Sequence, residues 1–337
     1  MEAFIPRVVF IQKAALQYPL GSRLMKEFNA RGIEVSLYEK RVPTTPGRTF
    51  RDSFLSAKHT MVVLVRAKRE FQTCKPSAHY QLPLVSGCPG HCQYCYLNTN
   101  LGKNPFVKVY VNIDEILEQA EEYVDRRKPE VTVFEGSATS DPVAVESWTG
   151  SLQEAIRFIA TLGSAGFRFA TKYGYVQNLL KLEHNGKTEV RFSINSDYVV
   201  RQFEAGTPPL ENRLKAAREI SLAGYPLGFL IGPIIHFPEW RSEYMSLLDL
   251  TRAHIPEGVP VSFELITHRF TTRAKTIIEE VYPDTQVPLG QEGRRFKYGQ
   301  FGYGKYVYEK ELMREMEEFF RTAIGTLFQE GKLLYFV

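Results

Sequence analysis

Residues 82–95 read Leu82-Pro-Leu-Val-Ser-Gly-Cys88-Pro-Gly-His-Cys92-Gln-Tyr-Cys95, and this stretch decides how the rest of the chain is interpreted. Its apolar start is typical of a buried strand, and three cysteines follow in a C-x3-C-x2-C pattern. Three thiolates leave one iron of a [4Fe–4S] cluster without a protein ligand. An open coordination position is typical of a metal centre that carries out chemistry. We therefore predict that Cys88, Cys92 and Cys95 are ligands of such a cluster.

Two other uses of these cysteines fit the sequence less well. A disulfide framework is disfavoured, because the chain has only four cysteines in 337 residues and is long enough to bury a core. A structural zinc site could combine the three cysteines with His91, but structural zinc sites usually take a second, distant pair of ligands. No second pair of closely spaced cysteines occurs here.

The composition is that of a globular protein with a mildly basic balance. The formal net charge is +4, the sequence pI is near 8.7 and the mean hydropathy is −0.24. This balance permits a polyanionic partner without requiring one. No apolar stretch approaches the length of a membrane span, so no membrane association is expected. Cysteines that must stay reduced indicate a cytoplasmic location.

Strand and helix patterns alternate along most of the chain, which indicates βα units on a parallel sheet. After an α/β extension over 1–78, residues 79–337 are expected to form a partial (β/α) barrel of the TIM type. A doubly wound open sheet is the alternative. The expected strands are 82–86, 107–111, 131–135, 167–171, 190–194, 227–231 and 261–266. The expected helices are 114–127, 151–162, 175–182, 209–223, 238–253 and 272–281.

Polar residues and glycines recur just past the expected strand ends, where active sites of such sheets lie. A ligand that carries an amine, a carboxylate, a ribose and an adenine could be bound by this set. A lysine suits the carboxylate, hydroxyls and an aspartate suit the amine and ribose, and glycine lets the backbone approach the base. Each residue alone is more often a cap or a solvated side chain. The set is Ser140, Asp141, Lys172, Ser193 and Gly232.

An open iron beside such a pocket is typical of the radical S-adenosylmethionine (AdoMet) enzymes, and further motifs make the match closer. The sequence resembles the spore photoproduct lyase family from about residue 5 to the C-terminus. The resemblance is carried by the motifs Lys75-Pro-Ser-Ala78, Cys92-Gln-Tyr-Cys-Tyr-Leu97, Phe134-Glu135, Thr139-Ser-Asp141, Thr171-Lys-Tyr173, His184-Asn-Gly-Lys187, Arg191-Phe-Ser-Ile-Asn-Ser196, Phe263-Glu-Leu-Ile266, His268-Arg-Phe270 and Gly304-Lys-Tyr-Val-Tyr308.

The resemblance implies a partial (β/α)6 barrel and a DNA repair lyase. In that family a [4Fe–4S] cluster reduces AdoMet, and a 5′-deoxyadenosyl radical takes a hydrogen atom from the methylene-bridged thymine dimer. The lesion then returns to two thymines. The implied partners are double-stranded DNA that carries the lesion and an electron donor of the ferredoxin or flavodoxin type. A monomer in the cytoplasm, and in the spore core, is expected.

Residue by residue, the resemblance assigns Cys88, Cys92 and Cys95 to the cluster. It assigns the five strand-end residues to AdoMet. Tyr94 and Tyr96 match a tyrosine pair thought to relay a hydrogen atom, although aromatic packing around the cluster is an equal alternative for both.

Residues 294–308 alternate cations and aromatic rings around a glycine-rich turn, which predicts a β-hairpin. Inserted rings and cations can hold an opened duplex, so the hairpin is expected to bind the lesion through Tyr298, Gln300, Phe301 and Lys305. A surface hairpin that only closes the barrel is the alternative. Gln300-Phe301 stands where the family has an Arg-Tyr pair.

The family's hydrogen-donating cysteine is replaced by Ala138, which has no S–H group. The remaining cysteine, Cys74, precedes the Lys75-Pro-Ser-Ala78 motif and is predicted to donate the hydrogen atom instead. A buried thiol that only packs is the alternative. Two further functions stay open: a radical AdoMet enzyme with another substrate, and a non-catalytic nucleic-acid-binding protein with a structural metal.

Overall fold

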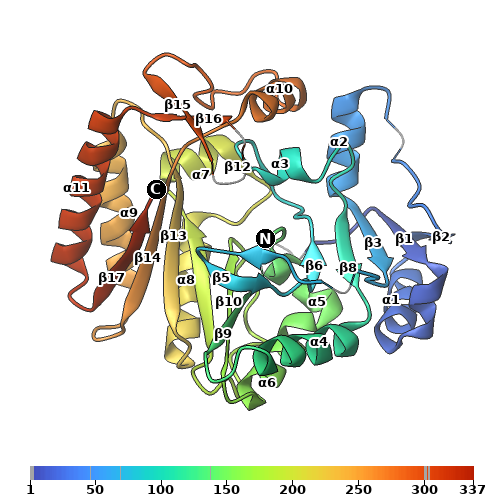
Figure 1. Ribbon diagram of the computed structural model, residues 1–337. Coiled ribbons are helices and arrows are strands. Elements are labelled where there is room, and N and C mark those ends of the chain that lie inside the picture. The colour runs from blue at the N-terminus through green and yellow to red at the C-terminus, as the bar shows by residue number, and fades with distance from the viewer. Residues whose placement is uncertain (1–3, 46, 69, 137, 300–301, 303) are drawn as a thin grey trace. The chain divides into compact units, whose positions relative to one another are not determined.

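A computed structural model describes residues 4–45, 47–68, 70–136, 138–299, 302 and 304–337 (Figure 1). The chain forms two compact units. The first contains Met1–Pro89 and Asn100–Val190, and the second contains Gly90–Thr99 and Arg191–Val337. The division of the sequence into 1–78 and 79–337 stays a prediction.

The first unit contains a five-stranded sheet in the order β2-β1-β3-β8-β6. Its strands are β1 Val8–Gln12, β2 Glu34–Tyr38, β3 Thr60–Leu64, β8 Val107–Tyr110 and β6 Val85–Ser86. All neighbours are parallel except β6 and β8. Alternate apolar residues of β1 bury against α1 Pro19–Ala30, where Leu24 and Phe28 are fully buried. Helix α2 Phe50–Lys58 begins with a capping box between Thr49 and Asp52.

The first unit also holds the strands β4 Thr73–Cys74, β5 Ala78–Gln81, β9 Thr132–Glu135 and β10 Ala165–Thr171, in that order. Strands β5, β9 and β10 are parallel, and β4 is antiparallel to β5. The helices between them are α4 Ile113–Asp125, α5 Glu146–Thr149 and α6 Ser151–Thr161. The strand β11 Thr188–Ile194 begins at the end of this unit.

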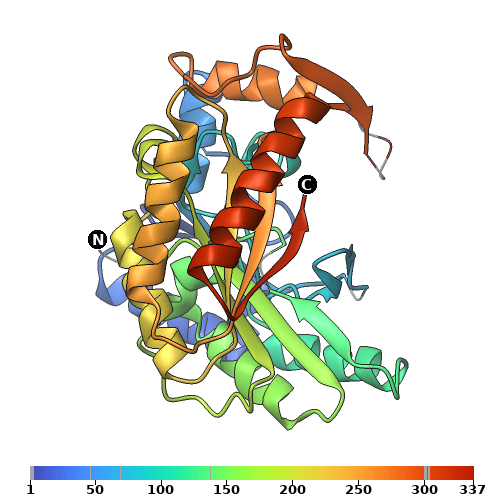
Figure 2. The ribbon, with the colours of Figure 1, turned by 90° about the vertical axis from the view of Figure 1, so that its left-hand side faces the viewer.

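In the second unit β11 is followed by β13 Leu227–Ile234, β14 Val261–Thr267 and β17 Gly331–Phe336, and β14 is parallel to both neighbours. The helices are α7 Asp197–Phe203, α8 Leu210–Leu222, α9 Trp240–His254, α10 Thr272–Val281 and α11 Lys310–Leu327. Figure 2 shows α9 and α11 side by side over the strands of this unit. Their contact is aromatic, since the rings of Tyr244 and Phe320 lie 5.3 Å apart.

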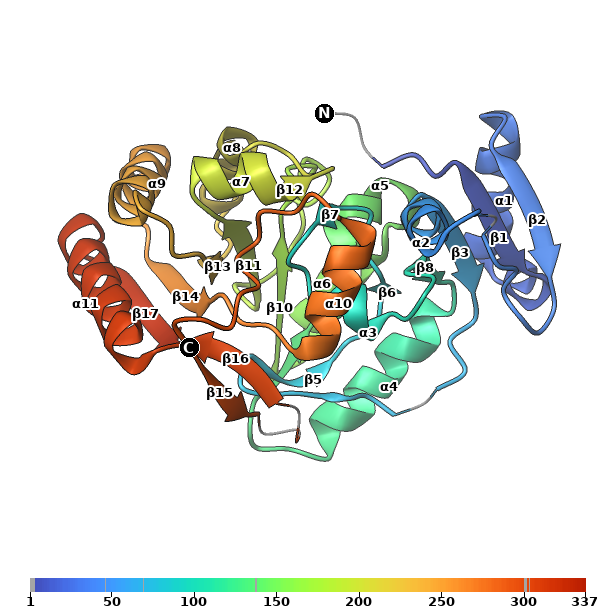
Figure 3. The ribbon, with the colours of Figure 1, turned by 90° about the horizontal axis from the view of Figure 1, so that it is seen from above.

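The expected hairpin over 294–308 is confirmed. It consists of β15 Arg294–Tyr298 and β16 Gly304–Tyr308, which pair antiparallel from Arg294 opposite Tyr308 to Tyr298 opposite Gly304. Figure 3 shows the hairpin apart from the helices that flank the parallel strands.

Three local expectations were wrong. Only Val85–Ser86 of the expected strand 82–86 is extended, and the strand that pairs with β9 is β5. The segment 107–111 is a strand as expected, but it joins β3 in the five-stranded sheet and not the barrel strands, because a short apolar run does not specify which sheet it joins. Residues 175–182 form a series of turns, in which Leu179 N–H donates to Val176 O and Leu182 N–H donates to Leu179 O. Within the described ranges, no helix has the length and apolar character needed to cross a bilayer.

Candidate active site

The start of the cysteine segment is fixed in the first unit by Gly87. Its φ is +83°, and a Cβ at this position would lie 2.1 Å from the carbonyl oxygen of Phe106, so only glycine fits. Its N–H donates to Thr139 O at 2.7 Å, and Gly87 forms a β-bridge with Ser140. The buried Lys58 side chain donates to Cys88 O at 3.2 Å. The first cysteine is thus held next to the loop that follows β9.

The rest of the cysteine segment is held within the second unit. The short strands β7 His91–Cys92 and β12 Glu204–Ala205 pair antiparallel, with Cys92 opposite Glu204. The Asn98 side chain donates to Cys92 O at 3.1 Å, and Cys95 N–H donates to the same carbonyl at 3.2 Å. These bonds fix the backbone around Cys92 and Cys95.

The donor chemistry of the three cysteines suits an iron–sulfur cluster. None of them forms a disulfide; Cys92 is buried, and Cys88 and Cys95 are half-buried. In the described part of the chain, no three His, Cys, Asp or Glu side chains are already grouped around one point as metal ligands. The assignment to a cluster therefore depends on the number, spacing and softness of the thiols.

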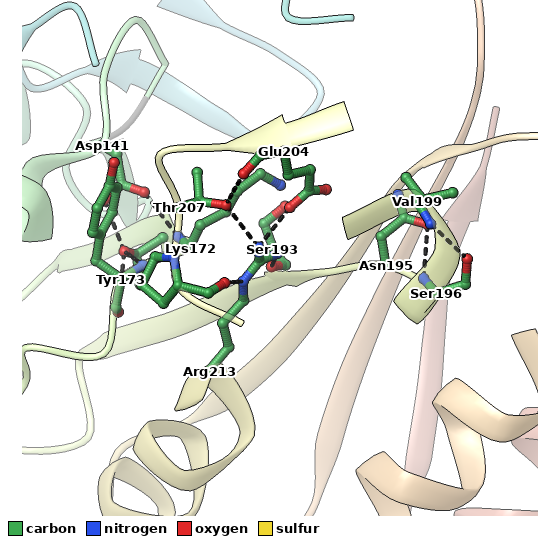
Figure 4. A network of polar contacts seen from close by, with 12 residues as sticks. Asp141, Lys172, Tyr173, Ser193, Asn195, Ser196, Val199, Glu204, Thr207 and Arg213 are labelled. Atoms are coloured by element: carbon green, nitrogen blue, oxygen red, sulfur yellow. Dashed lines mark hydrogen bonds and ion pairs between the residues drawn. The ribbon is translucent and has the colours of Figure 1, made fainter. Parts of the chain in front are cut away.

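Tyr94, between the second and third cysteines, is hydrogen-bonded to a buried ion pair, whose members Glu204 and Arg213 are labelled in Figure 4. Its hydroxyl donates to Glu204, whose carboxylate lies 2.6 Å from the Arg213 guanidinium. Burial, followed by the charge of Glu204, raises the pKa of Tyr94 well above its usual range. Tyr94 is therefore a protonated phenol that points at a carboxylate.

Tyr96 differs from Tyr94 in its exposure. It is 56% exposed, so its side chain is accessible to a bound substrate or cofactor. Tyr94, by contrast, packs against the apolar cluster around Phe203 and Phe270. The two tyrosines have different surroundings, and the packing alternative describes Tyr94 better than Tyr96.

Asp141 links the loop after β9 to the end of β10 (Figure 4). Its carboxylate accepts a hydrogen bond from Thr171 Oγ1 at 2.7 Å and one from the backbone N–H of Lys172 at 2.8 Å. Burial raises the pKa of Asp141 to about 6, against the opposite effect of these hydrogen bonds. Two of the predicted AdoMet residues are thus brought together by the fold.

Ser140 supplies an observation that points to a ligand. Its side chain is 9% exposed, and its Oγ is buried with no hydrogen-bond partner among the described residues. A buried hydroxyl without a partner costs free energy unless a ligand or water satisfies it. This fits the predicted role of Ser140 in binding AdoMet.

The predicted residues of the second unit lie on neighbouring strands. Ser193 is near the end of β11, and its carbonyl accepts from Arg213 at 3.1 Å. Gly232 lies at the irregular end of β13, where the register with β14 shifts between Ile231 and Ile234. A Cβ at Gly232 would crowd Leu230 and Ile266.

The expected lesion-binding residues are described in part. Tyr298 is 71% exposed and Lys305 is half-buried, so both are accessible. Gln300 and Phe301 lie outside the described residues.

Cys74 lies at the tip of the β4–β5 hairpin, opposite Ala78. The turn after it is anchored, since Ser77 donates to Glu135 at 2.7 Å and Arg168 donates to Ser77 O at 2.8 Å. Cys74 pairs with the start of β5, and β5 runs parallel to β9, so Cys74 lies level with the start of β9. Ala138, by contrast, follows the end of β9. The two positions are therefore not equivalent in the sheet.

Glu204, Arg213 and Lys58 were not predicted from the sequence. Thr171 was noted only as part of the motif Thr171-Lys-Tyr173, although it ends an expected strand directly before Lys172. The other three act through burial and long-range pairing, which no local pattern reveals.

Comparisons with known proteins agree along the whole chain. The family model described as spore photoproduct lyase matches residues 4–337. The chain belongs to the spore photoproduct lyase family. The spore photoproduct lyase of Clostridium acetobutylicum is 46% identical over all of both chains, and that of Bacillus subtilis is 43% identical over 99% of this chain and 98% of its own.

Solved structures of the family extend the agreement to the fold. A spore photoproduct lyase with bound AdoMet and dinucleoside spore photoproduct, in which one cysteine is mutated to alanine and one serine to cysteine, superimposes with a TM-score of 0.97 at 44% identity over all of both chains. Another, complexed with dinucleoside spore photoproduct, gives the same TM-score at 43% identity. The expected α/β fold with a strongly curled half-barrel sheet is thereby confirmed, as is the classification as a radical AdoMet lyase.

Proposed function

We propose that this chain converts the spore photoproduct in DNA back to two thymines by radical AdoMet chemistry. The observation that carries the proposal is full-length membership of the spore photoproduct lyase family, combined with the intact C-x3-C-x2-C segment. When bound, the [4Fe–4S] cluster supplies the electron that cleaves AdoMet and starts the radical reaction. The protein holds the groups in place and keeps water out.

The chain's own residues divide this work. Cys88, Cys92 and Cys95 would hold the cluster and leave one iron open for AdoMet. Asp141 and the unpartnered hydroxyl of Ser140 would bind polar groups of AdoMet, together with Lys172, Ser193 and Gly232. Tyr298, Gln300, Phe301 and Lys305 would bind the lesion. Tyr96, which is exposed, suits a hydrogen relay better than Tyr94, whose hydroxyl is bound to Glu204.

Cys74 would supply the hydrogen atom that completes repair. Its S–H bond would break, the product carbon would gain the hydrogen, and a sulfur-centred radical would stay on Cys74 until Tyr96 gives up the hydrogen of its O–H group. The tyrosyl radical so formed would take a hydrogen atom from the 5′-deoxyadenosine left by AdoMet cleavage, which restores the phenol. Support comes from the AdoMet-bound relative, in which the cysteine changed to alanine and the serine changed to cysteine have the same separation in sequence as Ala138 and Cys74. Cys74 and Ala138 lie at different levels of the sheet. Cys74 would therefore approach the product from a different side than a cysteine at position 138 would.

The proposed partners are double-stranded DNA with the thymine lesion and an electron donor of the ferredoxin or flavodoxin type. We also propose that the protein acts as a monomer in the cytoplasm, and in the spore core of a spore-forming cell. Family membership supports these assignments.

The test is anaerobic reconstitution with iron and sulfide, reduction, and incubation with AdoMet and the lesion dinucleotide. We expect a reduced cluster whose EPR signal changes when AdoMet is added, and release of thymine from the lesion. A protein that binds only zinc would contradict the radical chemistry. A competent cluster that cleaves AdoMet but leaves the lesion intact would indicate a different substrate.

A further inference from the structure

Arg269 lies where the hairpin of the second unit meets the end of β14. The next residue, Phe270, pairs with Tyr306 of β16: Phe270 N–H donates to Tyr306 O at 3.2 Å, and Tyr306 N–H donates to Phe270 O at 2.8 Å. The segment that contains Arg269 is thus joined to the hairpin by a single antiparallel β-bridge.

The hairpin and the segment bridged to it have two chemically different faces. Residues opposite each other in an antiparallel pair share a face, and successive residues alternate between faces. Tyr306 lies opposite both Phe296 and Phe270, and its ring centroid is 5.3 Å from each of theirs. The other face carries Lys297 opposite Lys305, Arg295 opposite Val307 and, by the same alternation, Arg269. The Arg295 side chain already donates to Tyr308 O, so we call Arg269, Lys297 and Lys305 the basic face.

The basic face has an unbalanced charge. In the described part of the chain, no carboxylate forms an ion pair with Arg269, Lys297 or Lys305, and none of the three side chains makes a hydrogen bond. The buried carboxylate of β14, Glu264, accepts hydrogen bonds from Arg191 at 2.8 Å and from Tyr335 at 3.0 Å. Like charges directly opposite in a ladder are destabilising, so the arrangement has a cost in the free protein.

The cations affect one another. Burial lowers the pKa of Lys305 first, and the charges of Arg269 and Lys297 lower it further. Burial also lowers the pKa of Arg269, against a smaller opposite effect of Tyr335, since its guanidinium loses water without gaining a carboxylate partner among the described residues. A guanidinium carries five N–H donors and no acceptor atom of its own. When half-buried, it is suited to bind an anion that offers two oxygens side by side.

We propose that Arg269, together with Lys305, binds a phosphodiester of the lesion-bearing strand. This inference rests on the proposed function. Arginine binds phosphate through two parallel N–H···O bonds, which fixes the position of the strand as well as neutralising it. The phosphate would supply the negative charge that the basic face lacks, and the aromatic face would remain available to support the hairpin.

The dinucleoside form of the lesion tests this directly, because it has no phosphate, whereas the dinucleotide has one. Binding of both, and of a lesion-containing duplex, would be measured with the reconstituted protein over a range of salt concentrations. For Arg269→Gln we expect about tenfold weaker binding of the dinucleotide and unchanged binding of the dinucleoside. The log–log salt slope for the duplex should fall by about one. Arg269→Lys should keep most of the salt slope for the duplex, because the charge is retained, but should bind the dinucleotide more weakly than the unmodified protein does.

Arg273→Gln is the matched control, because Arg273 is exposed on α10 and forms no ion pair in the described residues. If Arg269→Gln weakens the binding of the duplex alone, the phosphate that Arg269 binds is next to the lesion and not the one within it. The site is then still a phosphodiester site. If Arg269→Gln weakens the binding of the dinucleoside and of the dinucleotide equally, or if it has the same effect as Arg273→Gln, the proposal is wrong. Failure of the proposed function is distinct: the unmodified protein would then release no thymine from either lesion.

Discussion

The carboxylate of Glu204 lies 2.6 Å from the guanidinium of Arg213, and both side chains are completely buried. Glu204 also accepts the hydroxyl of Tyr94 and lies opposite Cys92. Arg213 reaches in the other direction, to the carbonyl of Ser193. The pair therefore connects the cysteine segment to the end of β11, where a predicted AdoMet residue lies.

Removing one member of this pair should destabilise the fold strongly, because the other charge stays buried without a partner. Arg213→Met should lower the free energy of unfolding by about 3–5 kcal/mol, measured by urea denaturation. The control is Arg201→Met, which breaks the exposed Arg201–Asp197 pair and should cost roughly 0–1 kcal/mol. Equal effects of the two substitutions would show that the buried pair is not structural.

Each cluster cysteine should be indispensable for metal binding. Cys88→Ala, Cys92→Ala and Cys95→Ala should each abolish the absorbance near ~400 nm of the reconstituted protein, because two thiolates cannot hold a cluster with an open site. Iron content and the EPR signal should fall in parallel. Cys74→Ala is the matched control and should retain all three signals. Retention of the absorbance after any of the first three changes would refute the ligand assignment.

AdoMet binding should depend on the ionisation of Asp141. Burial raises the pKa of Asp141 from 3.8 to about 6, so below pH 6 the folded protein holds a neutral acid that cannot pair with a cationic amine. Affinity for AdoMet should therefore be constant above about pH 7 and fall by about tenfold for each unit below pH 6. Anaerobic equilibrium dialysis between pH 5 and 8 measures this.

Asp141→Asn separates this effect from other titrations. The variant should bind AdoMet more weakly at pH 7.5 and should lose the dependence near pH 6. Asp197→Asn, at an exposed site on α7, should behave like the unmodified protein. A pH profile that Asp141→Asn leaves unchanged would mean that another group titrates.

The sequence allowed the parallel strands from β9 to β14 and the hairpin to be predicted, because each has a local apolar or alternating pattern with clear breaks. Cys88, Cys92, Cys95 and Asp141 stand out in the sequence for the same reason, as each belongs to a short motif, and their roles stay predictions. The position of β8 beside β3 could not be predicted, since strand pairing depends on contacts between residues far apart in sequence. Glu204 and Arg213 were missed because an acid and a base become a site only when the fold buries them together.

The last prediction concerns Cys74 and Ala138. If Cys74 donates the final hydrogen atom, Cys74→Ala should leave the cluster and AdoMet cleavage intact, because neither uses this thiol. The product radical would then go unquenched, so thymine should fall and adducts with species derived from dithionite should rise. Product ratios by liquid chromatography and mass spectrometry measure this.

Ala138→Cys in the Cys74→Ala background tests whether the position or the thiol matters. This change returns a thiol to the loop after β9, three residues past the strand end at Glu135, and should restore clean thymine release. Ala138→Ser adds a hydroxyl of similar size with a stronger bond to hydrogen and should not. If Cys74→Ala gives the product ratio of the unmodified protein, Cys74 only packs at the tip of the β4–β5 hairpin, and the exposed phenol of Tyr96 becomes the remaining candidate donor.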